Sequence, residues 1–348
     1  MRAVWLDWAL LACVACGGNG ATSPDAGPDA STTIAPLDQV PLPARGYYLG
    51  VAPIPADGQS FQDAYLQVAS DAEWFPVWGR PSPFWEMATD CAGSWGETFI
   101  EDLGRENGMF PLVHFSFFGA GITLAKPDGM SVATLADPAW RAAYKGAVLE
   151  VIASVRPRYV SLGNEVNRWL DAHGSEEGDP NGFQHFVSLY EETYDAVKAL
   201  SPDTVAFCVF AREIVSDLET ADVPAALEMF DASKLDMIAF TTYAHAPAGI
   251  NSVTDLTDDY YLSAIPHALR AKPFAFTELA WPSIEHFGGQ QGQVDFLHAA
   301  LGRLTRDQGL DLRMAGWPWL HDLDDADETG LIEHDGTPKL VYAAWQAL

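Results

Sequence analysis

Eight short apolar runs, separated by stretches long enough for a helix and two loops, constrain the fold of this chain more than any other feature. From residue 47 onward they recur about every 38 residues, as strand-helix units do. Runs without polar alternation are typical of strands buried on both faces, as in a parallel sheet. The runs are Tyr48–Ala52, Trp74–Trp78, Phe110–Phe115, Tyr159–Gly163, Val205–Phe210, Met237–Thr241, Phe274–Thr277 and Met314–Trp317.

The stretches between the runs have helical periodicity. Ala139–Val155 and Phe183–Leu200 place apolar residues at a spacing of about 3.6, and Ser201-Pro202 ends the second stretch. Eight strand-helix units predict an α/β fold, a single (β/α)8 TIM barrel over residues 46–348. A doubly wound open sheet is the structural rival, but no glycine-rich phosphate turn follows an early run.

The N-terminal segment resembles an export signal of the lipoprotein type. Residues 1–16 combine a positive start, a short apolar run and small residues before Cys16, which we expect to carry the lipid. Lipidation at Cys13, a plain cleaved secretory signal and a misassigned start remain alternatives. Residues 17–45 contain mostly Gly, Ala, Ser, Thr, Pro and Asp, which predicts a disordered tether. We therefore expect an extracytoplasmic protein, either secreted or anchored to a membrane by its lipid.

The charge balance excludes nucleic acid as a partner. The chain has 19 Lys and Arg against 48 Asp and Glu, a net charge of −29 that repels phosphate backbones and anionic lipid headgroups. Membrane contact is therefore expected only through an N-terminal lipid. We also expect a monomer, with Cys91 and Cys208 as two separate thiols.

We expect no cofactor and no metal. The sequence has no His-Glu-x-x-His segment, no paired Cys-x-x-Cys and no phosphate loop. The acidic segment Asp322–Asp327 partly imitates a calcium loop, but Asp327 stands where such a turn needs glycine. We interpret this segment as a solvated acidic loop.

Two glutamates follow apolar runs, where barrel enzymes carry their chemistry. Glu165 comes after the fourth run and Glu278 after the seventh, each in a polar turn. Cleavage of a glycosidic bond needs a proton donor for the leaving oxygen and a second carboxylate for the anomeric carbon. In a retaining enzyme these groups lie about 5–5.5 Å apart. The alternative, that each glutamate only pairs with a nearby arginine, is less consistent with two acids in such positions.

The pairs Asn164-Glu165 and Thr277-Glu278 resemble those of clan A glycoside hydrolases, the retaining (β/α)-barrel superfamily. Within the clan, three segments resemble glycoside hydrolase family 53, the endo-β-1,4-galactanases. These segments are Val113–Ser116, Leu162–Asn167 and Leu235–Tyr243. The resemblance implies that Glu165 is the acid/base and Glu278 the nucleophile. We expect Glu165 to carry the proton at the start, since a second negative charge beside Glu278 is unfavourable.

Two segments depart from family 53. After His114 the chain has Phe117–Gly119 where that family places an aspartate, and Glu278–Ser283 resembles the nucleophile segment of family 17 β-1,3-glucanases. The implied function is retaining hydrolysis of a β-linked polysaccharide or oligosaccharide, with galactan as one candidate. A catalytically silent, glycan-binding surface lipoprotein on the same barrel is the alternative.

The resemblance also implies residues that support the two acids. Asn164 would hydrogen-bond the sugar 2-hydroxyl, and Tyr243 would donate its hydroxyl to Glu278. Arg80 would hold the same carboxylate by its charge, unless it is only a surface residue of its turn. We expect His114 to hydrogen-bond at the barrel mouth rather than to bind a metal, because no third ligand is identifiable.

Tryptophans at the end of the eighth run are candidates for sugar stacking. Trp317 and Trp319 flank Pro318 where an indole face can cover the apolar face of a pyranose. We expect one of them to form the floor of the subsite at the cleaved bond. Trp78, Trp85 and Trp281 are further candidates.

Overall fold

The computed structural model describes residues 33–78, 83–324 and 326–348, and in them parallel strands close into a barrel. The strand order is β7-β6-β3-β2-β1-β13-β12-β11-β8. Only Cys208 separates β7 from β8, and these two pieces pair with β6 and β11 respectively, so the fifth strand of the barrel closes the ring. The strands are β1 (Tyr48–Val51), β2 (Trp74–Val77), β3 (Phe110–His114), β6 (Tyr159–Ser161), β7 (Val205–Phe207), β8 (Val209–Ala211), β11 (Ile238–Thr242), β12 (Pro273–Leu279) and β13 (Asp311–Trp317).

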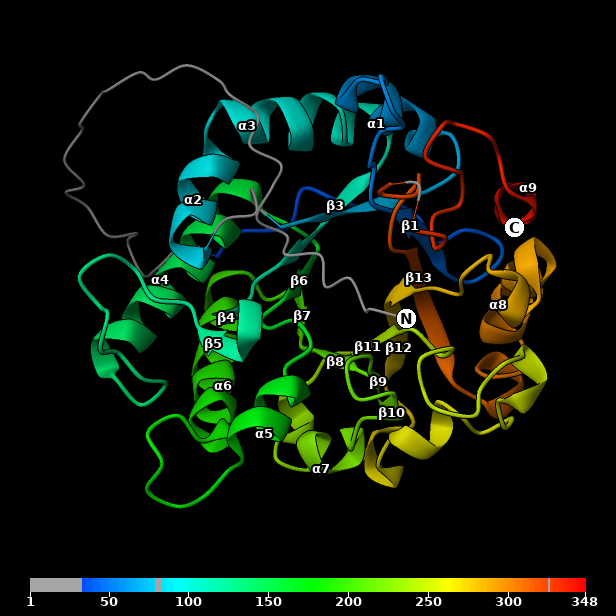
Figure 1. Ribbon diagram of the computed structural model, residues 1–348. Helices are drawn as coiled ribbons and strands as arrows, with labels where there is room; N and C mark the ends of the chain where they lie inside the picture. The colour runs from blue at the N-terminus through cyan, green and yellow to red at the C-terminus, as the bar shows by residue number, and fades with distance from the viewer. Residues whose placement is uncertain (1–32, 79–82, 325) are drawn as a thin grey trace.

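Each of the eight apolar runs forms a barrel strand, so the predicted TIM barrel is confirmed. The helices surround the ring of strands, as Figure 1 shows. The predicted helix at Phe183–Leu200 is α6, and the one at Ala139–Val155 is α4, which begins one residue earlier with Asp137 as its N-cap. The helices are α1 (Phe61–Ala69), α2 (Phe84–Ala92), α3 (Ser94–Gly96), α4 (Pro138–Val155), α5 (Asn167–His173), α6 (Phe183–Leu200), α7 (Val223–Leu227), α8 (Gly289–Leu301) and α9 (Leu340–Gln346).

One strand-helix unit is irregular. The described residues between β11 and β12 form no α-helix but three short 3-10 turns, at Val253–Asp255, Leu262–Ala264 and His267–Leu269. Pro247 and Pro266 in this stretch remove backbone donors that an α-helix needs. The chain therefore covers this side of the barrel with turns.

Two small hairpins extend the loops that follow β3 and β8. Phe118–Gly119 (β4) pairs with Thr123–Leu124 (β5), and Glu213–Ile214 (β9) pairs with Glu219–Thr220 (β10). Both hairpins follow the carboxyl ends of strands, which is the side where barrel active sites lie.

The interior of the barrel is filled by an inner cluster of apolar side chains around Trp74. Gly50 and Gly316 face the Trp74 ring so closely that an added Cβ at either position would overlap it. A residue without a side chain is therefore needed on each of two strands so that the Trp74 indole fits between them. The inner cluster comprises Tyr48, Trp74, Phe110, Leu112, Phe207, Val209, Met237, Ala239, Ala275 and Met314.

The chain before β1 is packed on the barrel from residue 33 onward, which differs from the expected boundary of the tether at residue 45. The Ile34 N–H donates to the Leu200 carbonyl at 2.8 Å, and the Asp38 carboxylate pairs with Arg105 at 2.7 Å. These partners directly precede strands of the barrel, so they lie at the amino ends of the strands. The segment therefore crosses the bottom of the barrel, opposite the carboxyl ends of the strands. Residues 1–32, with Cys13 and Cys16, lie outside the described residues.

Two further findings concern the described part of the chain. Cys91 and Cys208 are buried and not joined, so the expectation of two separate thiols is confirmed. None of the helices there combines the length and the apolar character needed to cross a bilayer.

The packing of Trp74 predicts that Gly316→Ala and Gly50→Ala each lower the free energy of unfolding by at least about 1–3 kcal/mol, since overpacking a filled core costs that much. Urea denaturation measures the change. Gly146→Ala is the matched control, because a Cβ at that position in α4 meets nothing within 4 Å. It should raise the free energy of unfolding by about 0.5–1 kcal/mol. Unchanged stability in both barrel variants would contradict this packing argument.

Candidate active site

A β-bulge directs Glu278 into the barrel mouth. Ala275 belongs to the inner cluster and Phe276 packs outside, between strands and helices, so strict alternation would turn Glu278 outward like Phe276. The register between β11 and β12 shifts here, leaving Thr277 unpaired and pairing Glu278 with Thr241. The extra residue re-aims the side chain that follows it. A regular strand would have buried this carboxyl group among the helices.

Glu165 is placed by a tight turn after β6. Its backbone has φ of 48°, the left-handed region that glutamate adopts only where the surroundings impose it. A Cβ on Gly163 would lie 2.6 Å from Val166 and 2.7 Å from Phe186, so the turn has no space for a side chain there. Asn167 fixes the turn to β8, because its amide exchanges two hydrogen bonds of 2.7 and 2.8 Å with the backbone of Ala211.

Thr241 connects the two glutamates. Its hydroxyl donates to Glu165 Oε1 at 2.8 Å, while its backbone is the ladder partner of Glu278 on the neighbouring strand. Parallel strands lie about 4.8 Å apart, so both carboxyl groups belong to one end of the barrel. The sequence analysis did not single out this threonine.

Glu278 is half-buried, and desolvation is the main reason why its pKa is raised from 4.5 to about 7. The negative charge of Glu165 also raises this pKa, which shows that the two groups interact electrostatically. The Tyr243 hydroxyl donates to Glu278 Oε2 at 2.8 Å, as the resemblance implies, and this bond lowers the pKa. Tyr243 itself keeps its proton, because burial raises its pKa well above 10.

Glu165 has a cationic partner that the sequence analysis missed. Arg168, in the first turn of α5, donates to Glu165 Oε2 at 2.6 Å. The expectation that Glu165 carries the proton at the start stays a prediction. The i, i+3 spacing of an acid and a base was the available signal.

His114 and Asn164 present polar atoms that no described residue satisfies. His114 Nδ1 and Asn164 Oδ1 are buried and without a hydrogen-bond partner in the described part of the chain. Burial lowers the pKa of His114 to about 3, so its ring is neutral, and it stacks on Trp78 with ring centroids 4.3 Å apart. Buried polar atoms normally have partners, so these two are suited to a ligand.

The structure corrects the expectation for Trp317 and leaves that for Trp319 as a prediction. Trp317 is 1% exposed, packs on Trp345 of α9 and donates its ring N–H to the Thr329 carbonyl at 2.7 Å. Because Gly316 faces the interior, alternation turns Trp317 outward. Trp319 donates to Asp327 at 2.7 Å.

Asp327 belongs to the acidic loop, and its carboxylate stabilises that loop. Its two oxygens accept from Trp319, from the backbone N–H of Leu323 and of Thr329, and from the Thr329 hydroxyl. No group of three His, Cys, Asp or Glu side chains within the described ranges could hold a metal ion. Arg80 lies outside the described residues.

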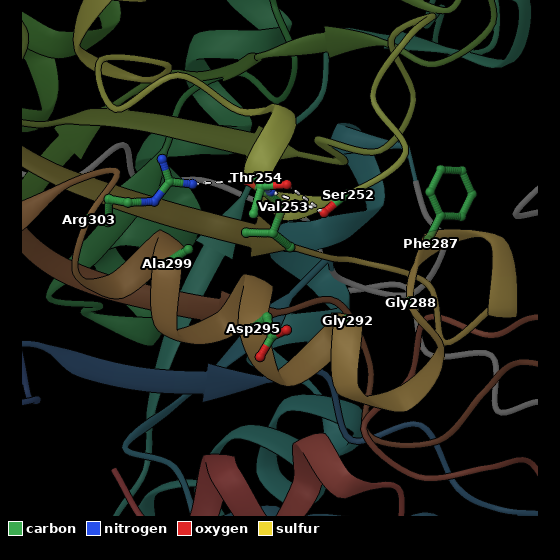
Figure 2. Close-up of a pocket in the computed structure, with 9 residues that line it drawn as sticks. All are labelled: Ser252, Val253, Thr254, Phe287, Gly288, Gly292, Asp295, Ala299 and Arg303. Carbon is green, nitrogen blue, oxygen red and sulfur yellow. Dashed lines mark hydrogen bonds between the residues drawn. The ribbon is translucent and has the colours of Figure 1, made fainter.

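A hollow of about 560 Å³ lies elsewhere, between the 3-10 turn at Val253–Asp255 and α8 (Figure 2). Arg303 points into it but already donates to the carbonyls of Val253 and Leu256 and to Asp258. Neither glutamate lines this hollow, so we do not connect it with the site. Its lining residues are Ser252, Val253, Thr254, Phe287, Gly288, Gly292, Asp295, Ala299 and Arg303.

No protein-family model matches the sequence, and no curated protein matches it either. Solved structures with a similar fold include GH5_18 from Streptomyces cattleya in complex with GlcNAc, with a TM-score of 0.61, 17% identity and coverage of 88% of this chain and 80% of that one. Another is a psychrophilic family 10 endo-β-1,4-xylanase, with a TM-score of 0.59, 15% identity and coverage of 87% and 96%.

A third is the β-glucuronidase of Bifidobacterium dentium complexed with coumarin-3-O-glucuronide, with a TM-score of 0.54, 13% identity and coverage of 86% and 46%. At such identities the similarity shows a shared fold. It confirms the barrel that the clan A resemblance implies, while the nearer resemblances to families 53 and 17 remain predictions. The chain thus has the TIM-barrel fold found in these glycoside hydrolases.

The site predicts how Glu278 titrates. A hydrogen bond to the ionised form lowers a carboxyl pKa, so Tyr243→Phe should raise the pKa of Glu278 above its value of about 7. Carboxyl ¹³C NMR of protein labelled at its glutamates measures the change, with the resonance assigned by its loss in Glu278→Gln. Tyr342→Phe is the control, since Tyr342 bonds Asp71 away from the site. An equal or lower pKa in Tyr243→Phe would contradict the role of this hydroxyl.

Proposed function

We propose that this protein is a retaining glycoside hydrolase that cleaves β-linked polysaccharide or oligosaccharide by double displacement. Glu278 is the nucleophile and Glu165 the acid/base. The observation that carries the proposal is the position of Thr241, which binds one carboxyl group and is paired in the sheet with the residue that bears the other. Two carboxyl groups brought together at a barrel mouth are what this reaction needs.

The electrostatic interaction between Glu165 and Glu278 supports the proposal, and the contact of Arg168 with Glu165 adds a requirement to it. An acid/base and a nucleophile together need one proton, and the repulsion that raises the pKa of Glu278 disfavours two charges. Arg168 contacts Glu165 Oε2 at 2.6 Å. Catalysis therefore requires Arg168 to release Glu165 when the sugar binds, so that Glu165 can hold the proton of the pair.

The unpartnered atoms beside the pair support a sugar as the ligand. Asn164 Oδ1 can accept from a sugar hydroxyl, and the neutral ring of His114 can donate or accept from Nδ1. The known structures with this fold include complexes with GlcNAc and with a glucuronide, which also favours a glycan substrate. A panel of β-1,4-galactan, β-1,3-glucan, xylan and β-mannan with a reducing-sugar assay tests the class and chooses within it.

The alternative is a catalytically silent glycan-binding protein, and one observation favours it. Arg168 donates to Glu165 Oε2 and the Thr241 hydroxyl donates to Glu165 Oε1, so both oxygens of the proposed proton donor already accept hydrogen bonds. Binding of a glycan without release of reducing ends, at every pH between about 4 and 9, would support this alternative and exclude the hydrolase.

The two acids should respond differently to the leaving group. Glu165→Ala removes the proton donor, so natural glycans should lose roughly 10²–10⁴ in rate, whereas aryl glycosides with a good phenolate leaving group should keep much of their glycosylation rate. Glu278→Ala removes the nucleophile, so both substrate types should fail. Burst and steady-state kinetics on matched aryl and natural β-glycosides measure this difference.

Glu219→Ala is the control for these variants, because Glu219 is exposed on β10 and should keep its rate on both substrates. The same response of Glu165→Ala and Glu278→Ala to leaving-group quality would show that the assigned roles are wrong. Full activity of either variant on polysaccharide would do the same.

We also propose that the chain is exported and carries lipid on Cys16. Cys16→Ser should then move the protein from the membrane fraction to the soluble fraction of cells that express the full chain, because a lipid chain supplies the membrane affinity. Cys13→Ser is the matched control and should leave fractionation unchanged. If Cys13→Ser alone releases the protein, lipid on Cys13 is the better account, and fractionation that changes in neither variant would point to a protein without lipid.

A further inference from the structure

A buried glutamate that the sequence analysis missed lies directly behind the site. Glu213 begins β9, immediately after the end of β8, and is 4% exposed. Its carboxylate accepts from the backbone N–H of Tyr243 on Oε2, and from the hydroxyls of Thr242 and Tyr260 on Oε1, at 2.7–3.0 Å. All three donors converge on one buried charge.

Glu213 does not face the interior of the barrel. Its partner Thr242 follows Thr241 on β11, and because Thr241 points to the mouth, alternation turns Thr242 outward. Thr242 also meets the hydroxyl of Tyr261, a residue of the outer packing, at 3.1 Å. Glu213 therefore cannot touch a ligand in the mouth and must act through its neighbours.

The charge of Glu213 is balanced by Arg212. This guanidinium is buried, donates to the Tyr260 carbonyl at 3.0 Å and lies 4.4 Å from the centre of the Tyr260 ring. The pKa of Glu213 is raised above its ordinary value, because burial outweighs Arg212 and the three hydrogen bonds, which lower it. Among the described residues, Arg212, Tyr260 and Tyr261 interact electrostatically with Glu213. Its partner Tyr243 is also acted on by Glu278, Glu165 and Asp327.

We propose that Glu213 is a positioning residue for Glu278 and acts by fixing Tyr243. The carboxylate holds the Tyr243 backbone from outside, and the Tyr243 hydroxyl donates to Glu278 at 2.8 Å inside the mouth. A hydrogen bond to an ionised acceptor is roughly twice as strong as one to a neutral acceptor. Loss of the charge on Glu213 thus loosens Tyr243 and weakens the bond that keeps Glu278 ionised. This inference rests on the proposed function for its catalytic consequence only.

The direction in which the pKa of Glu278 moves distinguishes positioning through Tyr243 from a direct effect of the Glu213 charge. Removing the negative charge of Glu213 would by itself favour ionisation of Glu278 and lower its pKa. Loosening Tyr243 has the opposite effect and raises this pKa. We expect Glu213→Gln to raise the pKa of Glu278 in the carboxyl ¹³C titration, and not to raise it when Tyr243→Phe is already present, because only the direct effect of the charge then remains.

The expected loss of kcat/KM in Glu213→Gln depends on pH. On the acid limb of the pH profile kcat/KM follows the ionised fraction of Glu278, so Glu213→Gln should move this limb to higher pH and lose about threefold in kcat/KM there, with a smaller loss at the optimum. Glu213→Asp keeps the charge and should recover part of the loss. Asp38→Asn is the control, since it disrupts a buried ion pair at the bottom of the barrel and should lower stability without altering the titration.

Several outcomes would overturn the inference. One is a lower or unchanged pKa of Glu278 in Glu213→Gln. Another is that Glu213→Gln changes this pKa equally in the wild-type and Tyr243→Phe backgrounds. If Glu213→Gln does not fold, Tyr260→Phe removes one bond to the carboxylate and should raise the pKa of Glu278 in the same direction; no change there would also overturn it. The titration does not need turnover, so a protein that hydrolyses no glycan but titrates as expected would refute the proposed function and keep this inference.

Discussion

The packing of Trp74 inside the barrel is the constraint on which the rest of the structure depends. The indole fills space that Gly50 and Gly316 leave free on two other strands, and the inner cluster closes around it. Because the interior is filled by apolar side chains, polar groups are accommodated only at the ends of the strands. The carboxyl ends of the strands then become the one place where acids from several segments converge.

Irregular backbone, rather than regular elements, places the two acids. Glu278 reaches the mouth because Thr277 adds a residue to β12, and Glu165 does so in a left-handed conformation that Gly163 and Asn167 maintain. Such features cost free energy and persist where the surrounding packing imposes them. That both acids depend on them is consistent with a site selected for chemistry rather than for stability.

The barrel could be predicted from the sequence, whereas the detail of the site could not. Eight apolar runs were enough for the strands, and Glu165 and Glu278 were found by their place after two of them. Trp317 was misjudged because its exposure depends on the alternation set by Gly316, which a position after a strand does not reveal. Glu213 was missed since it follows the fifth run without a motif, and its partners come from residues about 30 and 47 positions later in the chain.

The distribution of cations around β11 distinguishes Glu278 from two neighbouring carboxyl groups. Three carboxyl groups lie around β11, and two of them have an arginine of their own, Arg168 for Glu165 and Arg212 for Glu213. Among the described residues Glu278 receives only the Tyr243 hydroxyl, and no cation compensates its burial. Arg80 is the predicted cation for this position and lies outside the described part. The charge of Glu278 consequently depends on its hydrogen bond with the Tyr243 hydroxyl. A residue that fixes Tyr243 therefore affects the ionisation of Glu278.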